Sequence, residues 1–110
     1  MSSATCDALV VSVRTDERGA QEAARWAGRV HGESVGAVVG SDARLEERIQ
    51  AASRVLVLDP TVTAAWRGFG ARATSRERLQ LVARLADRPG HVTWASTASQ
   101  ADRWLGSRQA

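Results

Sequence analysis

The feature that most limits how this chain can fold is a regular alternation of short apolar runs with longer amphipathic segments. The apolar runs occupy residues 8–13, 35–39, 54–58 and 91–95. Nearly continuous apolar runs of this length are typical of strands that are buried on both faces, as in a parallel sheet. The segments between the runs repeat their apolar residues with the spacing of a helix.

Four helices are expected between and after these strands. The first covers residues 16–30, and Gly32 is placed to end it. Ser41 and Asp42 are residue types that cap the second helix. Two capping-box patterns, at 74–77 and 97–100, open the last two helices. The helix that follows Thr74 is expected to direct four apolar side chains inward: Leu79, Val82, Leu85 and Ala86.

Alternating strands and helices imply parallel strands, right-handed crossovers and helices on both faces of the sheet. We therefore predict an α/β fold, a flavodoxin-like three-layer sandwich with a four-stranded parallel sheet. At this length, residues 1–110 form one domain. Residues 59–73 are the one irregular stretch.

The charged residues are unusual because all 15 basic residues are arginine. This usage is typical of a GC-rich bacterial genome, and it excludes any mechanism that needs a lysine amine in this chain. Residues 60–80 contain four arginines and one glutamate, so the whole net charge of +3 lies there. Weak net charge argues against general nucleic-acid binding unless the charge is concentrated, as it is in this segment.

The remaining composition favours a cytoplasmic protein. No apolar stretch approaches the roughly 20 residues of a membrane helix, and no basic residue precedes the first apolar run as in a secretory signal. Cys6 is the only cysteine, so an internal disulfide is excluded, and a buried inert thiol is expected.

Polar residues stand where the predicted strands end, which is where open parallel sheets bind ligands. The candidate ligand-binding residues are Asp16, Ser41, Asp42, Asp59, Thr61, Ser96 and Thr97. Several of them open helices whose free N–H groups could hold an anion. The same residue types are also what helix N-caps require, so this structural interpretation stays open beside the functional one.

The segment WRGFGARATSRER alternates aromatic and basic side chains on a glycine-broken stretch. The candidate partner-binding residues are Trp66, Arg67, Phe69, Arg72, Arg76 and Arg78. Such a segment suits an anionic partner, which the arginines would bind while the aromatic rings stack. Alternatively, the aromatic rings cover the sheet and the arginines are solvated.

The stretches LVVS, VLVLDP and HVTWAST resemble the first, third and fourth strands of response-regulator receiver domains. The resemblance places Asp59 at the phosphate-acceptor position. Two departures separate the chain from an active receiver: Ser12 and Val13 replace the acidic pair, and the essential lysine is missing. SRVLVLDPTVTAAW is also similar to the layout of TIR domains, but no glutamate follows Trp66.

These observations favour a non-catalytic regulatory or protein-interaction module of pseudo-receiver type. We expect no catalytic residue, metal or cofactor, and a protein partner or a second copy of the chain bound through residues 60–80. One alternative is a small phosphate- or nucleotide-handling enzyme that uses Asp16, Asp42 and Asp59 around a metal. Another is a nucleic-acid binder that uses the arginine segment.

Overall fold

The computed structural model describes residues 7–60, 72–86 and 90–106. Four strands alternate with helices in these residues: β1 (Ala8–Ser12), β2 (Val35–Val39), β3 (Arg54–Leu58) and β4 (Val92–Ala95). The helices are α1 (Glu17–Ala27), α2 (Leu45–Ala51), α4 (Ser75–Arg84) and α5 (Ala98–Leu105). The strand positions therefore match those predicted from the apolar runs to within one residue.

The strands form one parallel sheet in the order β2-β1-β3-β4. In register, Val10 of β1 lies between Ala37 of β2 and Leu56 of β3. The two central strands are buried along nearly their whole length, which explains their continuous apolar sequences. This confirms the predicted α/β class and the four-stranded parallel sheet.

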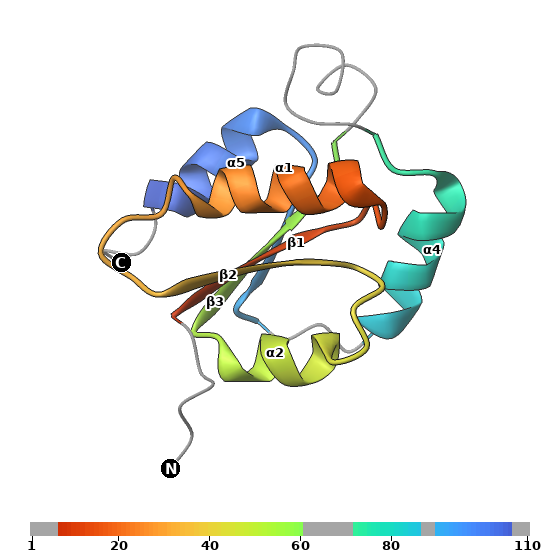
Figure 1. Cartoon of the computed structure of the whole chain (residues 1–110), viewed down its shortest axis with the longest axis horizontal. Helices are drawn as coiled ribbons and strands as arrows, with labels where there is room; N and C mark the ends of the chain where they lie inside the picture. The colour runs from red at the N-terminus through yellow and green to blue at the C-terminus, as the bar shows by residue number, and fades with distance from the viewer. Residues whose placement is uncertain (1–6, 61–71, 87–89, 107–110) are drawn as a thin grey trace.

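The helices cover both faces of the sheet, giving three layers (Figure 1). On one face, α1 and α5 lie side by side and contribute Trp26 and Trp104 to the core. On the other face, α2 and α4 contribute Leu45, Ile49 and Leu81. Because successive strand residues point to opposite faces, β1 and β3 supply side chains to both layers.

Most of the helix boundaries follow from local capping chemistry. Both predicted capping boxes are present: the Thr74 and Thr97 side chains accept hydrogen bonds from the backbone N–H groups of Glu77 and Gln100, respectively. The first helix is shorter than predicted, because Gly28 already caps it and Gly32 follows in a left-handed turn with φ 78°.

Two details of the predicted helices are wrong. Arg44, rather than Ser41 or Asp42, precedes α2; the Asp42 carboxylate instead accepts a hydrogen bond from the Arg44 N–H group at 2.8 Å and closes a turn. In α4 the inward side chains are those of Leu81 and Leu85, whereas Leu79, Val82 and Ala86 are exposed.

Candidate functional site

The carboxyl edge of the sheet brings polar residues from β1, β3 and β4 next to the first turns of α1 and α4. Asp59 follows β3 directly and is buried, with only 7% of its side chain exposed. Its backbone N–H donates to the Ala95 carbonyl of β4 at 2.9 Å, so the strand pairing itself fixes its position.

Among the described residues, two side chains bind the Asp59 carboxylate. Arg78 of α4 donates from Nε to both oxygens, at 2.9 and 2.8 Å, and from Nη2 to Oδ1 at 2.8 Å. Trp94 of β4 donates from Nε1 to Oδ2 at 3.0 Å. The hydrogen bonds to Asp59 raise the pKa of the Arg78 guanidinium above its ordinary value. The carboxylate thus joins β3, β4 and α4 through a bidentate arginine pair and an indole N–H group.

Glu77 makes the second junction at this edge, and the sequence pattern identified it only as a capping residue. Its Oε1 accepts from the Thr74 N–H and hydroxyl groups at 2.8 and 3.0 Å. Its Oε2 accepts from the Thr15 N–H and hydroxyl groups, both at 2.7 Å. Burial raises the pKa of this carboxyl, but the hydrogen bonds from Thr74 and Thr15 outweigh burial and lower it to about 2.

Asp16 also has a structural role, as the N-cap of α1. Its Oδ1 accepts from the Gly19 N–H group at 3.0 Å, and Arg14 Nε donates to both of its oxygens at 2.7 and 2.9 Å. The hydrogen bonds from Arg14 and then Gly19 lower the pKa of Asp16 to about 2. Gly19 allows the close approach, since a Cβ atom there would lie 2.0 Å from the Arg14 carbonyl oxygen.

The three acids of the proposed enzyme site, Asp16, Asp42 and Asp59, have separate partners. Arg48 lies 3.8 Å from Asp42, which is at the end of edge strand β2 and is separated from β3 by β1. Within residues 7–60, 72–86 and 90–106, no group of three or more His, Cys, Asp or Glu side chains could hold a metal ion.

The other candidate residues divide into described and undescribed ones. Ser41 is exposed after β2. At the end of β4, Gln100 Oε1 accepts from the N–H groups of Ser96 and Thr97 at 2.6 and 3.2 Å, so these residues complete the cap of α5. Thr61, Trp66, Arg67 and Phe69 lie outside the described residues.

The arginines of the partner-binding set are in three different situations. Arg72 and Arg76 are exposed, and no ion pair to either is found among the described residues. Arg78 is held by Asp59 and keeps 36% of its side chain exposed. Arg67 belongs to the undescribed part of the chain.

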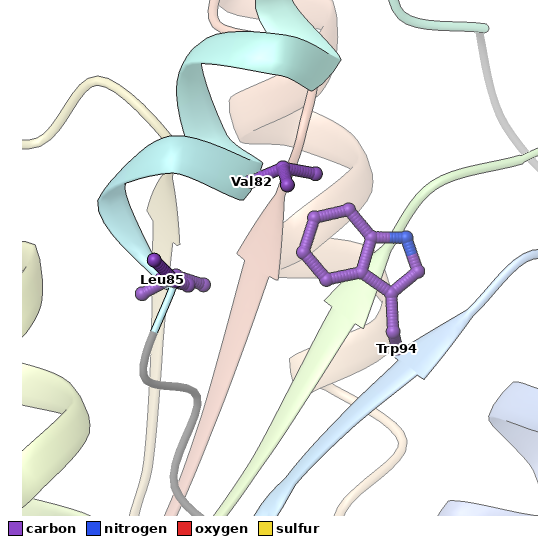
Figure 2. Close-up of a pocket in the computed structure, with 4 residues that line it drawn as sticks. Val82, Leu85 and Trp94 are labelled. Atoms are coloured by element: carbon purple, nitrogen blue, oxygen red, sulfur yellow. The ribbon is translucent and has the colours of Figure 1, made fainter.

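A separate feature lies beside β4, where an open groove of about 470 Å³ runs between this strand and α4. Val82, Leu85, Ala86 and Trp94 line it. Figure 2 shows the Trp94 indole reaching from β4 toward Val82, with Leu85 on the next turn of α4. The apolar pattern of α4 did not indicate this groove, because it placed Val82 in the core, whereas Val82 is 47% exposed.

The fold and this edge define an α/β protein in which arginines bind the strand-end acids Asp16 and Asp59. Threonines bind Glu77 of α4 at the same edge. No family model matches the chain, and neither the curated proteins nor the solved structures give a match. No helix in the described part of the chain is both long and apolar enough to cross a membrane.

Proposed function

We propose that this chain is a non-catalytic regulatory module of pseudo-receiver type, which binds a protein partner through residues 60–80. The observation that carries the proposal is the occupied carboxylate of Asp59. A phospho-acceptor needs a carboxylate oxygen free to attack phosphorus, whereas Arg78 and Trp94 bind both Asp59 oxygens. The guanidinium beside this carboxylate is therefore already paired with it inside the fold.

Two further observations support the proposal. The strand order β2-β1-β3-β4 is the order of the first four strands in flavodoxin-like sheets, the arrangement expected of a receiver relative. Arg72 and Arg76 are exposed at the end of the charged segment, where they are available to an acidic surface. A cytoplasmic bacterial setting is part of the proposal and rests on composition alone.

The test of the Asp59 role is incubation of the whole chain with acetyl phosphate and Mg²⁺, followed by intact-mass measurement. We expect no phosphate adduct on the native chain. A stoichiometric adduct that disappears in Asp59→Asn would show an active acceptor and would overturn the pseudo-receiver assignment.

The test of the contact segment uses the partner that co-purifies with the tagged chain from its own cell. Arg67→Ala combined with Arg72→Ala should weaken that binding about tenfold or more, a loss of about 1.4 kcal/mol. The melting temperature should stay nearly unchanged, because exposed arginines contribute little to folding. The control Arg18→Ala with Arg25→Ala removes two positive charges from α1 and should leave the affinity unaltered. If both double variants bind the partner with equal affinity, the contact lies outside residues 60–80.

A further inference from the structure

Strand β4 is an edge strand, and a groove opens on each of its two faces. It pairs with β3 along one side only. The groove toward α4 opens on one face, and a second groove of about 310 Å³ opens toward α5. Thr93, Trp94, Gln100, Arg103 and Trp104 line this second groove. No helix therefore covers the free side of β4 within the described residues.

Among the described residues, the backbone groups of β4 that face this free side have no hydrogen-bond partner. The His91 carbonyl accepts from the N–H group of Val55 in β3 at 3.0 Å, and the Ala95 carbonyl accepts from that of Asp59, directly after β3, at 2.9 Å. Alternate residues of a strand direct their backbone groups to opposite sides, so Val92 and Trp94 direct theirs outward. Such an edge is a template for the addition of another strand.

An exposed apolar surface borders the same edge. Leu79 and Val82 of α4 are 68% and 47% exposed, whereas Leu81 on the opposite face of the helix is 1% exposed. The ring of Trp94 continues this surface across the groove (Figure 2). Large apolar side chains gathered beside an open strand mark a contact surface rather than scattered surface residues.

The described helices beside this edge, α4 and α5, carry arginines that could bind an acidic partner. Arg76 stands one turn before Leu79, Arg103 lines the α5 groove, and neither makes an ion pair with another described residue. The described acids of α4 and α5 are engaged elsewhere: Glu77 binds Thr15, and Asp102 pairs with Arg29 of α1 at 2.8 Å. An occupant of this edge meets two arginines that make no ion pair among the described residues, while the exposed Asp102 carboxylate is already paired with Arg29.

We propose that β4 binds an extended, acidic segment of a partner protein as an additional strand. Alternating residues of that segment would place apolar side chains in the α4 groove and carboxylates on the side of Arg103. Arg76 would bind a further carboxylate beside α4. The inference rests on the proposed interaction function and specifies the chemistry of the partner.

Charge complementarity favours this occupant over two others. A second copy pairing through β4 would bring only its own Arg76 and Arg103 to the edge, and not the carboxylates that these arginines could bind. A nucleic acid would satisfy the arginines but would leave the backbone groups of Val92 and Trp94 without a strand to bind.

The experiment screens a phage-displayed library of short random peptides against the full chain. The enriched peptides should carry net negative charge with alternating apolar residues. Synthetic versions should bind Val82→Glu and Arg103→Glu about tenfold more weakly than the native chain, or worse. Both positions are exposed, so the variants should fold. The matched control Ala37→Glu, on the exposed face of edge strand β2, should keep the affinity.

Amide hydrogen exchange measured by NMR tests strand addition directly. The peptide should slow exchange at Val92 and Trp94, and leave Ala37 unchanged. The inference would be overturned by enrichment of basic peptides, by undiminished binding to Val82→Glu, or by unchanged exchange at β4. A native dimer that Val82→Glu dissociates would show that a second copy occupies the β4 edge. Binding of labelled oligothymidine that Arg103→Glu abolishes would show that a nucleic acid does.

The two proposals fail in different ways. If the co-purifying partner is lost in the Arg67 and Arg72 double variant but retained in Val82→Glu, the interaction function stands and the added strand does not. If Asp59 accepts phosphate while acidic peptides still bind β4, the added strand stands and the pseudo-receiver assignment does not.

Discussion

At the scale of the residue, the Asp59–Arg78 pair is asymmetric, because the two charges differ in their access to water. The Asp59 side chain is 7% exposed and the Arg78 side chain 36%. If the carboxylate is removed, the guanidinium can turn toward solvent. If the guanidinium is removed, the carboxylate stays in the fold with the Trp94 indole N–H as its remaining side-chain donor. The loss of stability on removing Arg78 therefore differs from the loss on removing Asp59.

We predict that Arg78→Ala lowers the free energy of unfolding by about 3 kcal/mol, since it leaves a buried charge without its counterion. Asp59→Asn should cost only about 1 kcal/mol, because the amide oxygen still accepts a hydrogen bond. Urea unfolding at neutral pH measures both changes, with exposed Arg76→Ala as the control. Equal losses in the two variants would mean that water reaches the Asp59 carboxylate and that the pair adds little.

At the scale of the element, the predicted strands and capping boxes are correct because they depend on local sequence. The four apolar runs become four strands, of which the central β1 and β3 are buried, and both capping boxes form as their spacing indicates. The polar strand ends are also correctly located. Their partners could not be predicted, because Arg78 reaches Asp59 from 19 residues away only after the helix is docked.

The predicted orientation of α4 was wrong because it also depends on partners that meet only after the helix is docked. Its sequence contains two overlapping apolar stripes, one with Leu79 and Val82 and the other with Leu81 and Leu85. Charged residues, among them Arg78 and Arg84, lie beside the second stripe. In the structure these arginines have acidic partners: Arg78 binds the buried Asp59, and Arg84 pairs with the half-exposed Glu46 at 2.7 Å. Both ion pairs form while Leu81 and Leu85 are buried in the core.

The helix orientation can be tested with two leucines on the same helix. Leu81→Ala should lower the free energy of unfolding by about 3 kcal/mol, because it removes a fully buried side chain and leaves a cavity. Leu79→Ala should change it by less than about 0.5 kcal/mol, as for other exposed positions. Chemical denaturation of both variants measures the difference. Similar losses at the two positions would show that α4 packs on the sheet through its other stripe.

At the scale of the whole molecule, the loops and helices are joined by carboxylates that are more acidic than usual. Glu77 joins α4 to the loop after β1, Glu46 joins α2 to Arg84 of α4, and Asp16 caps α1. The hydrogen bond from Arg84 is the main cause that lowers the pKa of Glu46 to about 2. Asp16 and Glu46 are about half exposed, so solvent and salt screen their contributions.

Acid should therefore unfold the protein mainly through Glu77. A carboxyl whose pKa falls from 4.5 to about 2 on folding stabilises the native state above pH 4.5, and this contribution is lost as the pH falls toward 2. Glu77→Gln keeps one oxygen for the Thr74 cap. It removes the negative charge and places an NH₂ group opposite Thr15. We expect this variant to be less stable than the native chain at pH 7 and to lose less stability on acidification.

Urea unfolding at a series of pH values, repeated in about 0.5 M NaCl to screen Asp16 and Glu46, measures both effects. The two stability curves should approach each other toward pH 2; curves that stay parallel from pH 7 to pH 2 would contradict the role assigned to Glu77.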